Sequence, residues 1–510
     1  MRFHHYVTAI LIANCTANLS FAQSPSSSEP QPSLQSETQR QPNIIFILVD
    51  DLGYGELGSY GQSKIKTPQL DKLAKEGMKF TQFYAGNTVC APSRAALITG
   101  RHTGKNQIRG NYELGGFLDE EEFGQLPLKP STATLGTMLK AAGYQTALIG
   151  KWGLGGPGSY GIPTKQGFDY FYGYLDQKQA HNHTPTHLWR NEDSVSLENA
   201  YLDTHQPLKV DFDPTKKDSF NSLKRENFAQ DSLTNEALSY VEKNKNNPFF
   251  LYLSYAGPHA ALQAPESEIE KYNFPDDIAK VPTEGNYIPA FKPRAARAAM
   301  VSYIDKHVGQ LVDKLRSLNL DKDTLVIFTS DNGPSFEGGA DLEFFDANGP
   351  LRGYKRDLYE GGIRMPMIAW WPGKITPNSS SNHVGAFWDM MPTFAQAANI
   401  NTPETDGISI LPTLLNKDLQ KQHQHLYWEF HHWQSGHSQA IRQKNWKAVR
   451  FYKKNKSGSI YMITELYNLD TDLGESVDLA DKLPLKVKEL EKLMDESRTP
   501  SWINDWNFDT

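Results

Sequence analysis

Residues 43–51 read NIIFILVDD, an unbroken apolar run that ends in two adjacent aspartates. Consecutive apolar side chains favour a strand that is buried on both faces, as the strands of a parallel sheet are. Similar runs return at 145–149, 249–255 and 324–330. Between and after them we expect helices at 68–78, 131–142, 226–244, 292–318 and 388–398. Alternating helices and buried strands indicate an α/β domain with a mainly parallel sheet.

The sequence changes character at about residue 422, where short aromatic-rich segments replace this alternation. We expect strands at 425–430, 439–442, 447–452 and 460–468, and a helix at 484–496. These elements predict a small antiparallel sheet packed against one helix. The chain is therefore divided into a main domain, 43–421, and a C-terminal subdomain, 422–510.

The N-terminal residues have the features of an exported protein. An apolar core at Tyr6–Ala13 precedes Ser20-Phe21-Ala22, which fits a signal-peptide cleavage site. We expect a signal peptide at 1–22 and a disordered linker, rich in Ser, Pro, Gln and Glu, at 23–42. Lipid attachment at Cys15 is the weaker alternative. The protein is expected to be periplasmic or secreted, and no later segment is apolar for long enough to span a membrane.

The composition suits a soluble globular protein with a large core. The 510 residues are 38% hydrophobic, 11% aromatic and 22% charged, and the formal net charge is −7. Without a broad basic field, the composition argues against a nucleic-acid partner, so an anionic ligand must be held by local positive charge. One of the two cysteines lies in the predicted leader, so the mature chain cannot form an intrachain disulfide.

The remaining cysteine opens the run CAPSRAALITG at residues 90–100. Pro92 keeps the chain out of a regular strand, Ser93 suits a helix N-cap, and helix-forming residues follow. Cys90 is therefore expected at the mouth of a helix, where backbone N–H groups favour anions, with the charge of Arg94 nearby. Such a thiol is either a small buried hydrophobe or a reactive centre, and its neighbours favour the second.

This run resembles the signature of type I sulfatases, Cys-x-Pro-Ser-Arg followed by Thr-Gly, a specific pattern because several positions are fixed at once. The resemblance covers most of residues 43–372. It implies an alkaline-phosphatase-like fold, a mainly parallel sheet sandwiched by helices. It also implies that a formylglycine-generating maturation enzyme converts Cys90 to formylglycine (3-oxoalanine), an aldehyde that works as its hydrate.

Two pairs of residues with side-chain oxygens follow predicted strands: Asp50-Asp51 after the first, and Asp331-Asn332 after the run at 324–330. Ligands of open parallel sheets lie beyond the carboxyl ends of the strands, so these side chains are expected to meet. Oxygen ligands without thiolate suit a hard cation, although Asp and Asn also serve as turn caps. The resemblance implies that the four bind one Ca²⁺, together with an oxygen of the modified cysteine.

Four further side chains complete the predicted catalytic set: Arg94, Lys151, His259 and Lys355. Arg94 belongs to the signature, while Lys151 and His259 follow predicted strands. Most lysines are solvated surface groups, but the segments around Lys151 and Lys355 resemble those that carry sulfate-binding lysines in sulfatases. The position of His259 at a strand end favours a functional role over a structural one.

The chain departs from the family pattern at Gly153, where the family usually has a histidine that contacts the sulfate. The segment 174–183 offers replacements. We favour His181, followed by His183 and Gln177, although all three also fit an exposed loop. The departure affects one binding contact and leaves the predicted enzyme class unchanged.

Further substrate-binding candidates lie later in the chain. Arg352 belongs to the segment that carries the predicted sulfate-binding lysine. Trp433 and His437 form a cluster with His431 and His432 in the C-terminal part, which either borders the pocket for the leaving group or is ordinary packing. An exported enzyme with an aromatic-rich rim suits a sulfated sugar or polysaccharide.

We therefore expect a sulfuric ester hydrolase that removes sulfate from a carbohydrate, with residues 43–421 as the catalytic domain. The formylglycine hydrate attacks sulfur, Lys151, Lys355 and the cation hold the sulfate oxygens, and His259 protonates the leaving oxygen. Alternative functions are those of an aryl sulfatase and of a phosphoester or phosphonate hydrolase on the same fold. The alternative from another class is a non-catalytic glycan-binding protein, which Gly153 slightly favours.

Overall fold

The computed structural model describes residues 41–208, 211–279, 287–417, 419–432 and 436–508. Residues 41–510 form one compact unit. The predicted signal peptide, Cys15, most of the predicted linker and Trp433 lie outside the described residues. Among the helices in the described ranges, none is long and apolar enough to cross a membrane.

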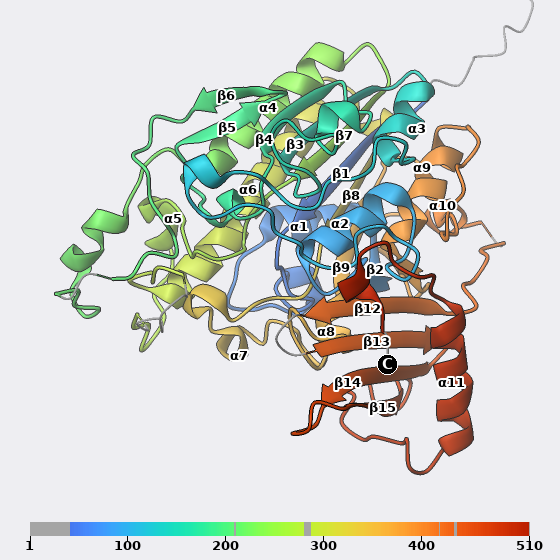
Figure 1. Ribbon diagram of the computed structural model, residues 1–510. Coiled ribbons are helices and arrows are strands. Elements are labelled where there is room, and N and C mark those ends of the chain that lie inside the picture. Colours follow the sequence, from blue (N-terminus) through green and yellow to red (C-terminus); the bar gives the residue numbers. More distant parts are fainter. Residues whose placement is uncertain (1–40, 209–210, 280–286, 418, 433–435, 509–510) are drawn as a thin grey trace, which may run out of the picture. The chain divides into compact units, whose positions relative to one another are not determined.

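The opening apolar run forms β1 (Asn43–Val49), a strand inside an 11-stranded sheet (Figure 1). It pairs in parallel with β7 (Phe249–Ser254) on one side and with β8 (Thr324–Ser330) on the other. All residues of these three strands are buried. The run is continuously apolar because both faces of the sheet are covered, as predicted.

The remaining strands extend this sheet on both sides, in the order β10-β2-β9-β8-β1-β7-β3-β4-β5-β6, with β11 beside β2. Their bounds are β2 Met78–Tyr84, β3 Gln145–Lys151, β4 Tyr170–Tyr174, β5 His187–Arg190, β6 Asp193–Ser196, β9 Arg364–Trp370, β10 Ser379–Ser381 and β11 Gly385–Ala386. Pairing is parallel from β8 through β1, β7 and β3 to β4. It is antiparallel around β9 and from β4 to β6. The sheet is therefore mixed but mainly parallel, which confirms the predicted class.

Helices cover both faces of the sheet. Successive side chains of β1 therefore point alternately into two cores, one on each face. Ile45, Ile47 and Val49 belong to the core shared with α1 (Pro68–Glu76), α4 (Ala229–Asn244) and α6 (Pro293–Ser317). The residues between them, Ile44, Phe46 and Leu48, belong to the core shared with α2 (Cys90–Thr99), α3 (Leu135–Ala141) and α9 (Met390–Ala397). Four one-turn helices lie in connections: α5 Glu266–Ile269, α7 Leu342–Phe345, α8 Glu360–Ile363 and α10 Leu411–Leu414.

The C-terminal part is a four-stranded antiparallel sheet with one helix along it, as predicted (Figure 1). Its elements are β12 Leu426–His432, β13 Gly436–Gln443, β14 Trp446–Lys454, β15 Ile460–Asn468 and α11 Pro484–Glu496. The strands pair in sequence order, and Tyr427, Ile441 and Leu466 pack with Leu490 and Met494 of α11.

Buried ion pairs join this sheet to the main sheet. Lys447 Nζ of β14 lies 3.0 Å from Glu360 Oε1 of α8 and 2.9 Å from Glu475 Oε1, with all three groups buried. Although burial raises it, the ammonium of Lys447 holds the pKa of Glu360 at about 2. Glu360 is also paired with Arg364 at 3.1 Å, whereas Lys447 is the cation that balances Glu475.

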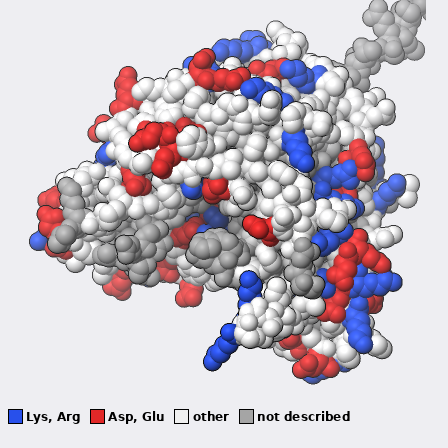
Figure 2. Space-filling view, in the orientation of Figure 1, with Lys and Arg blue, Asp and Glu red and all other residues white. Residues whose placement is uncertain are grey.

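Charges of both signs occur on the face of the molecule that Figure 2 shows. Figure 2 shows Lys and Arg interspersed with Asp and Glu over the face in view, in keeping with the net charge of −7. A mixed surface of this kind does not attract polyanions at long range.

We expect Lys447→Ala to lower the free energy of unfolding by about 3–5 kcal/mol, because it leaves the buried Glu475 carboxylate without its cation. The matched variant is Lys454→Ala, an exposed lysine of the same strand, which should change stability by less than about 0.5 kcal/mol. Denaturant titration of both variants is the measurement. Equal stability of the two would show that the ion pair contributes nothing.

Candidate active site

Three polar segments meet at the carboxyl edge of the parallel strands, as the sequence predicts. Asp50-Asp51 follow β1, and Asp331-Asn332 follow β8, whose Ser330 is in register with Val49. Lys151 ends β3, the partner of β7. All five side chains are 1% exposed or less. The topology therefore brings residues that are 280 positions apart into contact.

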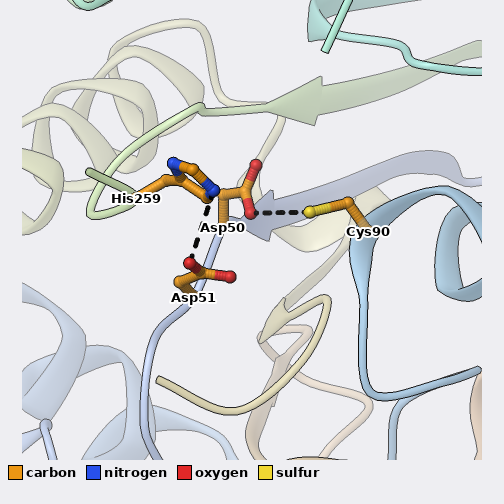
Figure 3. A group of neighbouring side chains, drawn as sticks. All are labelled: Asp50, Asp51, Cys90 and His259. Atoms are coloured by element: carbon orange, nitrogen blue, oxygen red, sulfur yellow. Dashed lines mark hydrogen bonds and ion pairs between the residues drawn. The ribbon is translucent and has the colours of Figure 1, made fainter. Parts of the chain in front are cut away.

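Cys90 faces this edge from the first turn of α2. Its Sγ lies 3.4 Å from Asp50 Oδ1 (Figure 3). Burial and the Asp50 carboxylate raise the pKa of the thiol well above its ordinary value. As a plain thiol it is protonated and a poor nucleophile.

The N-cap prediction for Ser93 is wrong. The helix begins at Cys90, with Val89 as its N-cap, four residues before the predicted N-cap, and Pro92 is accommodated in the first turn. The Ser93 hydroxyl instead donates to the backbone oxygen of Asp331 and accepts from the backbone N–H of Gly86. Ser93 thus ties the helix to the end of β8.

Arg94 lies one turn after Cys90 and points into the acidic cluster. Its guanidinium contacts Asp331 Oδ2 at 2.8 Å and Asp50 Oδ2 at 3.3 Å. It also donates to the backbone oxygen of Lys151 and to the Ser254 hydroxyl. Its Nε–H donates to Asp331 Oδ2 at 2.9 Å. With all five N–H groups engaged, Arg94 holds the carboxylates in place and has none left for a substrate.

The acidic cluster fits a hard cation. Asn332 Oδ1 is buried and has no hydrogen-bond partner among the described residues, and its amide donates to Asp51 Oδ1 at 2.6 Å. Burial and the Asp50 carboxylate raise the pKa of Asp331 to about 7, in spite of Arg94. Crowded carboxylates and an unsatisfied amide oxygen are what a divalent cation with oxygen ligands would balance.

Ligand atoms of Asp50, Asp51, Cys90 and His259 lie within 4.8 Å of one another (Figure 3). This group contains two of the four predicted oxygen ligands. Asp331 contributes Oδ1, which accepts from the backbone N–H of Asp51 at 3.3 Å. Asp51 itself has φ 63°, a conformation that is uncommon outside glycine and is held here by the surrounding bonds.

Lys355 and His259 form a hydrogen-bonded pair beside Asp51. Lys355 Nζ lies 2.8 Å from His259 Nε2 and 2.9 Å from Asp51 Oδ2. His259 Nδ1 contacts the backbone oxygen of Ala260. When the imidazole proton of His259 is on Nδ1, Nε2 accepts a hydrogen bond from the Lys355 ammonium. Burial and the Lys355 ammonium lower the pKa of His259, so the shared proton resides on the lysine in the ligand-free state.

Lys151 lies behind the acidic cluster. Its ammonium contacts Asp50 Oδ2, and the side chain is 1% exposed. Asp50 is therefore held by two cations, because Arg94 also reaches it. Although burial opposes it, the two positive charges lower the pKa of Asp50 below its usual range, with Lys151 the larger cause.

A cavity of about 370 Å³ opens over Cys90. Its lining includes five predicted site residues: Cys90, Gln177, His181, His259 and Lys355. The lining residues that the sequence analysis did not find are Asn111, Glu113, Phe117, Lys178, His205, Tyr287, Glu337 and Arg356. Most of these come from irregular loops without hydrophobic periodicity. Only Lys178 and Arg356, next to predicted residues, had a positional signal.

Three predicted substrate-binding residues do not line this cavity. His183 packs behind it, with Nε2 2.9 Å from the backbone oxygen of His259. Arg352 donates to the Tyr467 hydroxyl at 3.0 Å and so joins the two sheets. The ring of His437 contacts that of His431, with Nδ1 atoms 3.0 Å apart. For Arg352 and His437 the structure thus gives a packing role.

A larger cavity of about 610 Å³ lies elsewhere, lined by residues such as Phe220, Leu262 and Phe291. It contains none of the predicted site residues. Size therefore does not identify the site; the convergence of charged groups does.

The fold and the site define a member of the alkaline-phosphatase-like superfamily. The sulfatase family profile matches residues 42–400, and the profile of the N-sulphoglucosamine sulphohydrolase C-terminal region matches residues 352–499. The chain belongs to the sulfatase family.

Relatives agree with this assignment. N-acetylgalactosamine-6-sulfatase of Mus musculus is 32% identical over 390 residues, which cover 73% of this chain and 66% of that protein, just under two thirds of its length. Arylsulfatase G of Rattus norvegicus is 30% identical, covering 89% of this chain and 85% of that one. The crystal structure of Ps i-CgsB in complex with k-i-k-neocarrahexaose superposes with a TM-score of 0.70 at 29% identity, covering 91% and 95% of the two chains.

We expect Ca²⁺ to raise the melting temperature of chelator-treated protein, because binding to the folded state alone stabilises it. Asn332→Ala should reduce this shift, since it removes the oxygen that lacks a partner. Asn348→Ala is the matched control, another buried asparagine with an unsatisfied Oδ1. Calorimetric scans with and without Ca²⁺ test the expectation. An unchanged melting temperature of the unsubstituted protein would contradict it.

Proposed function

We propose that this protein is a sulfuric ester hydrolase that removes sulfate from a sulfated carbohydrate. The observation that carries the proposal is the position of Cys90: it lines one cavity with the Lys355–His259 pair and lies 3.4 Å from Asp50. Membership of the sulfatase family supports it.

We infer that residue 90 acts as formylglycine, made by a maturation enzyme. The buried thiol contacts a carboxylate and has a raised pKa, so it is unsuited to act as a thiolate. When converted, residue 90 supplies a hydrated aldehyde, whose hydroxyl can attack sulfur and whose second hydroxyl allows sulfate to be released by elimination.

Asp50, Asp51, Asp331 and Asn332 would hold the cation, which we assign as one Ca²⁺. When bound, the ion supplies positive charge beside the nucleophile and the sulfate oxygens. Arg94 fixes the orientation of two of these carboxylates. Its role in this proposal is positioning, and it does not contact the sulfate.

Lys355 and His259 have a double role in the proposed mechanism. The Lys355 ammonium lines the cavity and would bind a sulfate oxygen, while Lys151 adds charge from behind Asp50. The proton shared by Lys355 Nζ and His259 Nε2, 2.8 Å apart, is available to the leaving oxygen. His259 is thus the proposed general acid, with Lys355 as its proton source.

The proposed substrate class is a sulfated saccharide. N-acetylgalactosamine-6-sulfatase is among the relatives, and the Ps i-CgsB structure contains an oligosaccharide, k-i-k-neocarrahexaose. Phe117 and Tyr287 in the cavity wall offer aromatic faces, and Asn111 and Glu113 offer hydrogen bonds to hydroxyls. Export through a signal peptide at 1–22 to the periplasm or the medium belongs to the same proposal, because sulfated polysaccharides lie outside the cytoplasm.

We expect Cys90→Ala to abolish release of sulfate from sulfated oligosaccharides while leaving the melting temperature unchanged, because the small side chain removes the nucleophile alone. Ion chromatography of released sulfate is the assay, on protein made in a host with the maturation enzyme. Parallel phosphate, phosphonate and aryl sulfate esters separate the alternative activities. Faster turnover of a phosphate ester, or sulfate release by the alanine variant, would refute the assignment.

We expect His259→Ala to lower kcat on a sugar sulfate about 10²–10⁴-fold, because an alkoxide leaving group needs a proton. On 4-nitrophenyl sulfate the loss should be much smaller, since nitrophenolate leaves without one. The ratio of the two losses is the measurement. Equal losses on both substrates would place His259 outside proton transfer.

A further inference from the structure

Gln177 has an unsatisfied side-chain amide at the wall of the active-site cavity. The residue is 2% exposed, and neither Nε2 nor Oε1 has a hydrogen-bond partner among the described residues. It lines the cavity together with Cys90 and Lys355. Buried amides without partners are rare because they lose hydrogen bonds to water without replacement. Such a group inside a binding cavity indicates that a ligand satisfies it.

The backbone of Gln177 is firmly held. Its N–H donates to Gln125 Oε1 at 3.0 Å, and the Gln125 amide donates to Asp176 Oδ1 at 3.0 Å. Asp176 and Gln177 follow β4, the parallel neighbour of β3, which ends at Lys151. Gln177 thus lies at the same edge of the sheet as the cationic part of the site, and its bonded backbone presets the direction of the side chain.

Gly153 makes room for this side chain. A Cβ at position 153 would lie 2.6 Å from Gln177 Cγ and 3.0 Å from its Cδ. The Gly153 N–H donates to the backbone oxygen of Leu175, which fixes the two segments against each other. Gly153 and Gln177 are therefore a complementary pair, in which the missing side chain of one admits the other.

The other candidates for the same contact already have partners. His181 Nδ1 lies 3.0 Å from the Tyr287 hydroxyl and 3.4 Å from His205 Nε2, and its ring stacks on that of His259. His183 is bonded to the backbone oxygen of His259 outside the cavity. The sequence ranked His181 first, followed by His183 and Gln177; these contacts favour Gln177 for the contact with sulfate.

We propose that the Gln177 amide nitrogen donates a hydrogen bond to a sulfate oxygen of the substrate, in the space that Gly153 leaves open. The inference rests on the proposed sulfatase function and names one of its binding contacts. Sulfate oxygens accept hydrogen bonds but cannot donate them. The amide adds a donor without adding a charge at the wall of a cavity that is already lined by Lys178, Lys355 and Arg356.

The test measures binding of inorganic sulfate by titration calorimetry, and KM for a sugar sulfate. Gln177→Ala should weaken both by about ten- to a hundredfold, the worth of a hydrogen bond to a charged group. Gln177→Glu keeps the shape but turns the donor into a carboxylate, so it should weaken both further. Unchanged sulfate affinity in Gln177→Ala would overturn the proposal, even if KM rose, because the contact would then lie on the sugar.

Gly153→Ala tests the pairing with a matched control. Gly158→Ala has the same backbone strain, with φ 73° against 79°, but nothing lies within 4 Å of the added Cβ. Gly153→Ala should weaken sulfate binding and Gly158→Ala should not. In the double variant Gly153→Ala/Gln177→Ala the loss should equal that of Gln177→Ala alone. Additive losses would show that Gly153 acts through another residue.

The calorimetric measurement of sulfate binding separates this inference from the proposed function. If the unsubstituted enzyme releases sulfate but Gln177→Ala binds sulfate as tightly, the inference fails and the function stands. If the enzyme releases no sulfate from any ester but Gln177→Ala still loses sulfate affinity, the contact stands and the proposed activity fails.

Discussion

The site depends on one constraint: a dense set of charges is buried at the carboxyl edge of β1 and β8 and must be balanced there. Removing an ion from water costs several kcal/mol, which only close pairing offsets. Arg94 meets this requirement for Asp50 and Asp331 at once. Because Arg94 and Cys90 share the first turns of α2, the same contact fixes where Cys90 lies. The Arg94 guanidinium thus fixes α2, and Cys90 with it, relative to the ends of β1 and β8.

Charge balance also explains how the remaining groups are distributed. Lys151 and Lys355 each neutralise one of the two adjacent aspartates, and Lys355 is left facing the cavity with His259. The Asn332 amide donates to Asp51, and its unsatisfied oxygen suits the cation that we propose for this site. The neutral amide of Gln177 lies in the wall of the cavity. The site therefore offers an anion several donors while its own acids remain paired.

Much of this arrangement could be predicted from the sequence because it follows from topology. Apolar runs locate the buried strands, and residues just after them, such as Asp51 and Asn332, must share an edge. The cavity wall could not be predicted in this way. Glu113 and Tyr287 come from irregular loops, whose paths depend on tertiary contacts and not on periodicity. Ser93 was misassigned because a helix can start at the cysteine itself, with Val89 as its N-cap.

The sequence alone also could not show which loop residue contacts the sulfate. His181, His183 and Gln177 lie within one short segment, and only their contacts separate a stacked ring, a packed ring and an unsatisfied amide. Likewise, Arg352 and His437 have residue types that suit binding, yet one joins the two sheets and the other contacts His431. Trp433 lies outside the described residues and stays a prediction.

The most direct test of the account is the mass of the peptide that contains residue 90, in active protein purified from its native host. Conversion of the thiol to an aldehyde replaces sulfur by oxygen and removes two hydrogen atoms, which lowers the mass, and the aldehyde reacts with a hydrazide reagent that cysteine does not capture. The account predicts this lighter, hydrazide-reactive peptide. Active enzyme in which residue 90 is entirely cysteine would contradict it.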